Sequence, residues 1–140
     1  PTIDVSTSEA LAARLREATA IYVPDTERAT AGIHVVRVLD RLGLLASIAG
    51  KLRTYPNGAT AMQKLAREGE PGAIGCTQVT EILYTGGVVL SGVLPREFEL
   101  ATVYSAGVGA NAAEPALAAA FVAWITGERA AGLRKAGGFE

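Results

Sequence analysis

The sequence has only one cysteine, one histidine, one methionine and one tryptophan in 140 residues. A single cysteine excludes a disulfide within the chain and every metal cluster built on several cysteines, and a single histidine removes most other zinc arrangements. An excess of positive charge is also missing, because 13 basic residues are balanced by 14 acidic ones. We therefore expect no metal or other cofactor and no nucleic-acid partner.

Long apolar runs are missing as well. None approaches the roughly 18 to 20 residues that a helix needs to cross a bilayer, although 49% of the residues are apolar. This content is typical of a globular protein of about one domain, so we expect a single α/β domain over residues 1–140. Because the sequence begins at Pro1 and its only methionine is Met62, we also expect a trimmed or truncated protein.

Apolar periodicity and turn residues divide the chain into helices and strands. Val35 and Leu39 share the apolar face of the clearest helix, which Gly43 ends. Ser6, with Glu9 three residues later, forms a capping box for the first helix. In chain order, we predict a helix over 7–18, a strand over 20–23, a helix from about 30 to 42, a short helix over 44–52, a strand end and turn over 53–58, a helix over 59–69, and strands over 72–75, 88–95 and 100–108.

Two more helices are predicted at the end of the chain. Pro115 suits the first turn of one helix, and the other is expected to reach about Lys135. The expected buried stripe of the first one is Leu117, Phe121, Trp124 and Ile125. Strands that alternate with helices indicate crossover connections, so we predict the α/β class, as a three-layer sandwich with a mostly parallel sheet.

Ligands of such sheets bind beyond the carboxyl ends of the strands, where helix N-termini present free amides. The turns after residues 23, 75 and 106 are therefore candidate sites. Thr30, Ala31 and Gly32 follow the first of these strands, and their small side chains would let an oxyanion reach the backbone N–H groups without any lysine. The alternative is an ordinary threonine cap with a glycine in the first turn.

The second turn contains the only cysteine, Cys76. A cysteine nucleophile needs a base or cation nearby, and the only histidine, His34, is expected on the solvated face of an earlier helix. A buried apolar filler is the alternative for this cysteine. Thr77 and Gln78 are better suited to hydrogen-bond a ligand.

The third turn, GVGANA over residues 107–112, matches the G-x-G-x-x-A pattern of dinucleotide-binding loops. That site also needs a following strand with an acidic residue about 20 positions on, whereas the chain continues into two predicted helices. The glycines are better explained by a loop that leaves the strand. Paired carboxylates, G-x-S-x-G and a P-loop lysine are all missing, so we expect no enzyme.

Taken in order, the segments resemble the molybdate-binding-protein-like group of periplasmic solute-binding proteins, which serve ABC importers. The resemblance is carried by STSEALAARLREATAIYVPD, TAGIHVVRVLDRLG, GAIGCTQVTEIL, GVLPREFELATVYSAGV and EPALAAAFVAWITGERAAGLRKAGGFE. It implies a type II binding-protein fold, in which two α/β lobes close on a tetrahedral oxyanion held by hydroxyls and backbone amides. This chain would be the second lobe and C-terminal part, with the first lobe absent.

The resemblance also implies site residues, a location and partners. The ligand contacts of the second lobe would fall near Ala31, Gln78, Val79 and Tyr104, with Thr30, Gly32 and Thr77 beside them. The location would be the periplasm, and the partners would be a small anionic solute and the membrane subunits of an ABC transporter. The TQVTEI version of the second turn resembles a branch of the group whose solute need not be molybdate.

The leading hypothesis is therefore a non-catalytic substrate-binding component that recognises a small molybdate-like oxyanion or a related solute. The alternatives are a standalone oligomeric ligand-sensing or interaction domain of the same fold, and an enzyme that uses Cys76. Apolar surface meant to pack against a missing lobe would be exposed, so we also expect a homodimer or a domain-swapped oligomer.

Overall fold

The computed structural model describes residues 2–139. Contacts between residues divide the chain into two compact units, Pro1–Leu100 and Ala101–Glu140, and each is described by itself. The expectation of a single domain over the whole chain stays a prediction.

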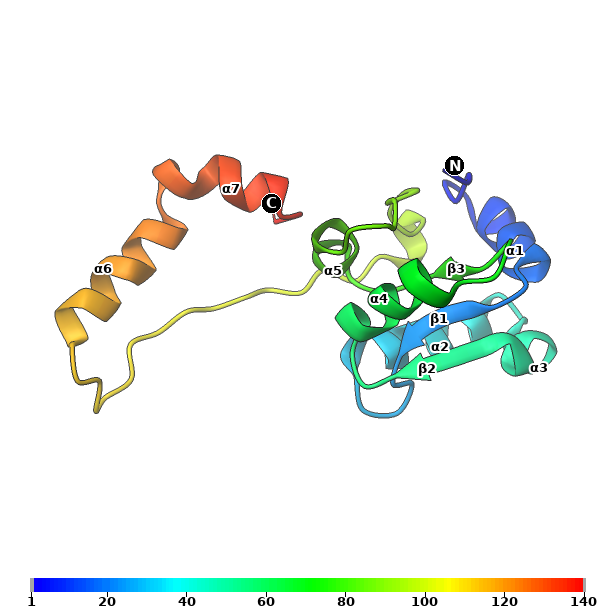
Figure 1. Cartoon of the computed structure of the whole chain (residues 1–140), viewed down its shortest axis with the longest axis horizontal. Coiled ribbons are helices and arrows are strands. Elements are labelled where there is room, and N and C mark those ends of the chain that lie inside the picture. Colours follow the sequence, from blue (N-terminus) through cyan, green and yellow to red (C-terminus); the bar gives the residue numbers. More distant parts are fainter. Residues whose placement is uncertain (1, 140) are drawn as a thin grey trace. The chain divides into compact units, whose positions relative to one another are not determined.

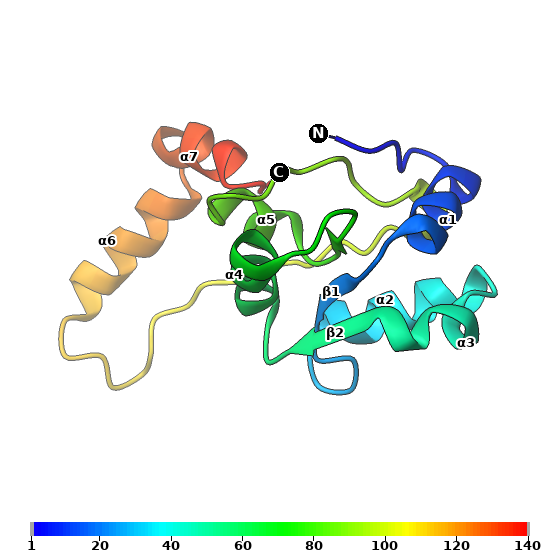
Figure 2. The ribbon, with the colours of Figure 1, turned by 45° about the vertical axis from the view of Figure 1, so that its right-hand side comes forward.

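A parallel sheet of three strands forms the centre of the first unit (Figure 1). Strand β1 (Ile21–Pro24) lies between β2 (Leu52–Tyr55) and β3 (Ile74–Gly75). Figure 2 shows β1 and β2 side by side, and the two pair over four residues. All four residues of β1 are buried, as expected of a central strand that is covered on both faces.

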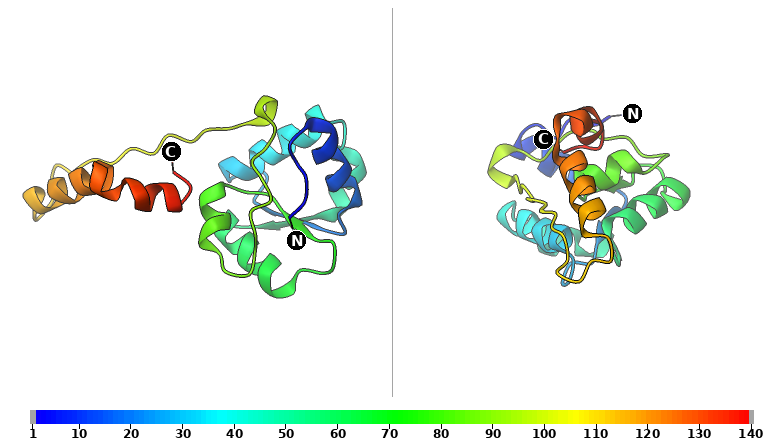
Figure 3. Two further views of the ribbon diagram at one scale, coloured as in Figure 1. Left: turned by 90° about the horizontal axis from the view of Figure 1, so that it is seen from above. Right: turned by 90° about the vertical axis from the view of Figure 1, so that its left-hand side faces the viewer.

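Helices cover both faces of this sheet. Three helices, α1 (Ser8–Glu17), α2 (Thr30–Arg41) and α3 (Leu45–Ile48), contribute to one apolar core, which includes Ile21 and Val23 of β1. Helices α4 (Gly58–Glu68) and α5 (Val79–Tyr84) contribute to the other, which includes Ala20 and Tyr22. Figure 3 shows α2 and α4 on opposite sides of the sheet. Alternate residues of one strand thus point into two cores, which confirms the predicted three-layer α/β arrangement.

The ends of the first helices test the predicted caps. Gly43 follows α2 with φ +65°, as a glycine that ends a helix should. The cap of α1 is Thr7, whose hydroxyl accepts the amide of Ala10 at 3.1 Å, so the prediction of Ser6 was wrong. The hydroxyl of Ser6 donates instead to the carboxylate of Asp4 at 2.7 Å. This local hydrogen bond replaces the cap interaction that was predicted for Ser6.

The predicted strands over 88–95 and 100–108 are not formed. In the described residues, the strand pairs join β1 to β2 and β1 to β3, and neither segment takes part. Val88 and Leu94 instead pack against the two cores, and the short 3₁₀ helix Arg96–Phe98 follows Pro95. Apolar residues in a strand-like pattern can pack in this way without a strand edge to pair with, and the pattern alone does not supply that edge.

The second unit contains α6 (Pro115–Thr126), the 3₁₀ turn Glu128–Ala130 and α7 (Ala131–Ala136), which meet at a bend (Figure 1). Pro115 begins α6 as predicted. The guanidinium of Arg134 donates to the carbonyls of Ile125 and Gly127, both at 2.8 Å, and so holds the end of α6 against α7. Within residues 2–139, no helix is long and apolar enough to cross a membrane.

The predicted buried stripe of α6 is exposed. The exposed fractions are 68% for Leu117, 59% for Phe121 and 48% for Trp124, and Ile125 is partly buried. The rings of Phe121 and Trp124 stack on each other at 6.5 Å. Spacing along a helix predicts which residues share one side of it, but burial also needs a second surface, which local periodicity does not specify.

Candidate functional site

The candidate site lies at the carboxyl edge of the sheet. The chain leaves β1 through a turn to α2, leaves β2 through Pro56 and Asn57 to α4, and leaves β3 through residues 76–78 to α5. Because all three strands are parallel, these turns lie at the same edge. The predicted residues 30–32 and 77–79 therefore share this edge with the turn between β2 and α4, which had not been predicted as part of the site.

Asp25 organises the first turn. Its carboxylate accepts the amides of Glu27 at 2.9 Å and Arg28 at 3.0 Å, and these two hydrogen bonds lower the pKa of Asp25. The turn leads to Ala29, the N-cap of α2, which makes no side-chain cap hydrogen bond. Thr30 is the first helical residue, so the alternative that explained it as the cap was wrong.

The three predicted residues of α2 differ in exposure. Thr30 is exposed, Ala31 is partly buried and Gly32 is buried. A Cβ atom on Gly32 would lie 2.2 Å from the carbonyl oxygen of Asp25 and 2.5 Å from that of Pro24. Gly32 therefore lets α2 pack directly against the end of its own strand. Amides in the first turn of a helix have no partner inside the helix, so they remain candidate donors to a ligand.

Thr77 and Glu81 connect the second and third turns of the edge. The hydroxyl of Thr77 donates to Oε2 of Glu81 at 2.5 Å, and Oε1 of Glu81 accepts the amide of Ala59 at 3.2 Å. A Cβ atom on Gly58 would lie 1.9 Å from the same Oε2 and 2.0 Å from the Thr77 hydroxyl oxygen. We call Gly58, Ala59, Thr77 and Glu81 the Glu81 cluster.

Glu81 and Gly58 were not among the residues predicted from the sequence. The four-residue spacing of Thr77 and Glu81 was a usable signal, because side chains so spaced can meet on one side of a helix start. The Asn57-Gly58 pair signalled a turn, and the Asn57 side chain indeed accepts the amide of Thr60 at 2.8 Å. The sequence does not show that the turn at Gly58 lies beside Glu81, because this follows only from the order of the strands in the sheet.

The other predicted residues of the second turn lie beside this cluster. Gln78 is the N-cap of α5, and its backbone carbonyl accepts the amides of Glu81 at 3.1 Å and Ile82 at 3.3 Å. Gln78 and Val79 are both partly buried. Their role as ligand contacts stays a prediction, as does that of Thr77.

Cys76 packs against the apolar core beside these residues. Burial of its thiol raises the pKa to about 11, so the thiol is protonated at neutral pH. The only histidine, His34, was expected to be solvated, but it is partly buried and its Nε2 lies 2.7 Å from the carbonyl oxygen of Phe98. The imidazole of His34 thus interacts with Phe98. Cys76, which packs against the apolar core, has the properties of a small apolar residue rather than those of a nucleophile.

Tyr104 belongs to the second unit. Its ring packs edge to face against Phe139 at 5.4 Å, and 57% of the residue is exposed. Its part in the site stays a prediction. The glycine-rich residues 107–112 form a loop before α6, as the loop interpretation expected, but the strand that this loop was expected to leave is not formed.

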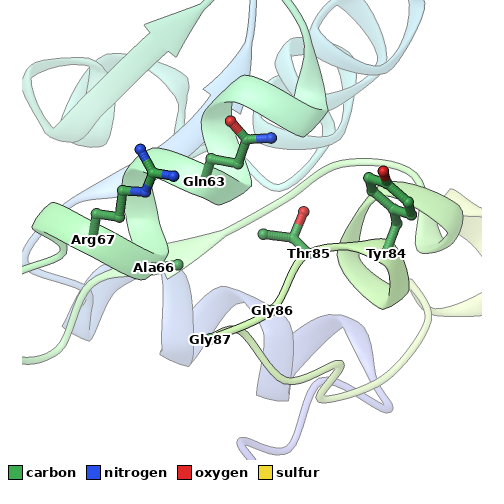
Figure 4. A pocket seen from close by; sticks show the side chains of 7 residues that line it. All are labelled: Gln63, Ala66, Arg67, Tyr84, Thr85, Gly86 and Gly87. Carbon is green, nitrogen blue, oxygen red and sulfur yellow. The ribbon is translucent and has the colours of Figure 1, made fainter.

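An open hollow of about 290 Å³ lies between α4 and the end of α5 (Figure 4). Its lining residues are Gln63, Ala66, Arg67, Tyr84, Thr85, Gly86 and Gly87. None of them was predicted to bind a ligand. Thr85 is buried there and its hydroxyl donates to the carbonyl of Glu81 at 2.8 Å, so this side chain serves α5 itself. Among residues 2–139, no group of three or more His, Cys, Asp or Glu residues could hold a metal ion.

Comparison with known proteins bears on the role of the chain but not on the location of a site. No curated protein and no solved structure gives a significant match. One family model does match, over residues 2–140, and its description is bacterial extracellular solute-binding protein. Since this match covers nearly the whole sequence, the chain belongs to the bacterial extracellular solute-binding protein family.

Proposed function

We propose that this chain is the substrate-binding component of an ABC transporter and that it binds a small oxyanion at the carboxyl edge of its sheet. Family membership supports the solute-binding role and a periplasmic or extracellular location. The observation that carries the site is the parallel pairing of β1 with β3, because this pairing puts residues 30–32 and 77–79 at one edge. Amide and hydroxyl groups there are the usual ligands of oxyanions in proteins.

The edge of one lobe is half of such a site. We propose that Thr30, Ala31 and Gly32 contribute first-turn amides, and that the turn at Gln78 and Val79 contributes further backbone groups. A first lobe of the kind that the family resemblance implies would supply the remaining donors. The membrane subunits of the transporter are the proposed protein partners.

Calorimetric titration tests the proposal. The chain is titrated with molybdate, tungstate, sulfate and phosphate, and at least one of these anions should bind. An Ala31→Asp variant places a carboxylate among the first-turn amides and should abolish that binding. The matched control is Ala13→Asp, on the partly buried side of α1 far along the sequence from both turns. The proposal fails if no anion binds, or if Ala31→Asp binds the anion as well as the original chain does.

The exposed apolar face of α6 favours a second candidate, a ligand-sensing domain that works as a homodimer. Leu117, Phe121 and Trp124 together present a face that a second copy could cover. Sedimentation equilibrium should then show a dimer, and Phe121→Ser should shift it toward monomer. A clean monomer at micromolar concentration would refute this candidate.

A further inference from the structure

The hollow between α4 and the end of α5 shares no lining residue with the proposed oxyanion site. Figure 4 shows the side chains of Gln63 and Arg67 on one side of it, Tyr84 on the other side and Thr85 between them. Gln63 and Arg67 are four residues apart on α4, so their side chains lie on the same face of that helix. The hollow is therefore lined by polar groups from two helices and from the strip of chain that follows α5.

This strip, Thr85–Gly87, is held against α4. Thr85 is only 7% exposed, and its hydroxyl donates to the carbonyl of Glu81. Gly87 has φ +93°, which favours glycine, and a Cβ atom there would lie 3.1 Å from the Cβ atom of Ala66. In the part of the chain that the structure describes, the N–H groups of Gly86 and Gly87 donate to no other backbone group. Two exposed amides therefore remain as donors beside the hollow.

Arg67 gives the hollow a positive charge that no lining residue neutralises. None of these residues is acidic, and among the described residues the guanidinium makes no ion pair and no hydrogen bond. Its place in the last turn of α4 suits the helix dipole, but this leaves its five N–H donors unused. A guanidinium presents these donors in a planar fork that matches a carboxylate. The lining of the hollow is therefore suited to a carboxylate group.

The openness of the hollow indicates where this carboxylate comes from. Gln63 and Arg67 are exposed, and Tyr84 is 85% exposed. Pockets for free small molecules usually bury most of the ligand surface, which walls as exposed as these do not achieve. An acidic side chain of another protein arrives with a surface of its own, which would cover the hollow. Arginine and tyrosine are also the residues that contribute most often to the binding energy of protein interfaces.

We propose that this hollow is a docking site for an acidic side chain of a partner protein. The carboxylate would accept hydrogen bonds from the guanidinium of Arg67 and from the amides of Gly86 and Gly87, and the backbone of the partner would pack on the ring of Tyr84. This inference goes beyond the proposed function, because it assigns a second site and a different ligand. It does not depend on oxyanion binding at the edge of the sheet.

NMR titration of the ¹⁵N-labelled chain tests the proposal with three probes. The first is the blocked peptide Gly-Glu-Gly, the second is the neutral peptide Gly-Gln-Gly, and the third is propionate, which carries the glutamate carboxylate without a peptide. The acidic peptide should shift the amide signals of Gly86 and Gly87. It should bind about threefold to tenfold more tightly than the neutral peptide, since the ion pair is partly exposed. Propionate should bind at least about threefold more weakly than the acidic peptide, because it lacks the contact with Tyr84.

Two variants locate the source of the preference. Arg67→Gln removes the charge at an exposed position and keeps a similar helix propensity, so the preference for the acidic peptide should fall to within about twofold. Tyr84→Ser should weaken binding of the acidic peptide to the level of propionate. The matched control is Arg37→Gln, which makes the same charge change at an exposed residue of α2, on the opposite side of the sheet from α4 (Figure 3). It should leave the preference unchanged.

Each outcome supports or overturns a stated part of the proposal. A preference for the acidic peptide that Arg67→Gln removes and Arg37→Gln keeps supports it. Unshifted signals of Gly86 and Gly87, or equal binding of the two peptides, overturn the carboxylate site. If propionate binds as tightly as the acidic peptide, docking of a protein is overturned and the hollow is a site for free carboxylates. A preference that survives Arg67→Gln overturns the role of Arg67. All of these failures leave the oxyanion proposal standing, because that proposal is tested with inorganic anions and with Ala31→Asp.

Discussion

Replacing Gly58 with alanine should destabilise the first unit, although alanine is normally the better residue in a helix. The new Cβ atom would lie 1.9 Å from Oε2 of Glu81 and 2.0 Å from the hydroxyl oxygen of Thr77, and both contacts are far shorter than atoms tolerate. Both atoms belong to side chains, so they can move away, and the hydrogen bonds of the Glu81 cluster are then lost.

The size of the effect follows from these contacts. Each hydrogen bond to a charged group contributes roughly 1.5 to 3 kcal/mol when buried, and the partial exposure of Thr77 and Glu81 reduces this range. The higher helix propensity of alanine offsets at most about 1 kcal/mol. We therefore expect the free energy of unfolding to fall by about 1 to 3 kcal/mol.

Urea denaturation followed by far-UV circular dichroism measures this change. The fluorescence of Trp124 is unsuitable, because the only tryptophan lies in the second unit. Gly50→Ala is the matched control, since nothing lies within 4 Å of a Cβ atom there, and it should change stability by less than about 0.5 kcal/mol. If Gly58→Ala is as stable as the original chain, the close packing of the Glu81 cluster is refuted.

Three further predictions concern single side chains. Iodoacetamide should label Cys76 slowly at neutral pH because burial raises its thiol pKa to about 11, and labelling faster than that of free cysteine would contradict this burial. Thr7→Ala should cost about 1 kcal/mol of stability in urea denaturation because it removes the cap of α1, whereas an equal loss for Ser6→Ala would restore the original cap prediction. Hydrogen bonds lower the pKa of Asp25 from 3.8, so its carboxylate stabilises the fold fully above pH 3.8, and this contribution is lost as the pH falls through the lower folded-state value. Asp25→Asn should flatten the acid side of the curve of stability against pH, and an unchanged curve would contradict this assignment.

Elements whose signals are local could be predicted from the sequence. The apolar run of β1 and the helical spacing of α2 are properties of neighbouring residues, and both elements formed within one or two residues of the predicted positions. The same holds for Gly43, because the left-handed conformation that ends α2 requires only the glycine itself.

Features that depend on a distant partner could not be predicted in this way. Residues 88–95 have the composition of a strand, but a strand also needs a neighbouring edge, and no described strand pairs with them. The stripe of α6 has the spacing of a buried face, yet Leu117 and Phe121 are exposed. In both cases the local sequence shows that a segment could pair or pack, but it does not show whether another part of the protein is there to pair or pack with it.

The candidate site combines both kinds of signal. The contact of Thr77 with Glu81 spans four residues and was available from the sequence, but the amide of Ala59 comes from 22 residues earlier in the chain than Glu81. Only the order β2-β1-β3, in which α4 connects the two outer strands, brings that amide to the carboxylate. Residue types at the turn after β3 therefore indicated a polar site, whereas the tertiary contact determines whether the hydroxyl of Thr77 donates or accepts. The hydrogen-bonding properties of this edge therefore depend on the parallel topology as much as on the residues that form it.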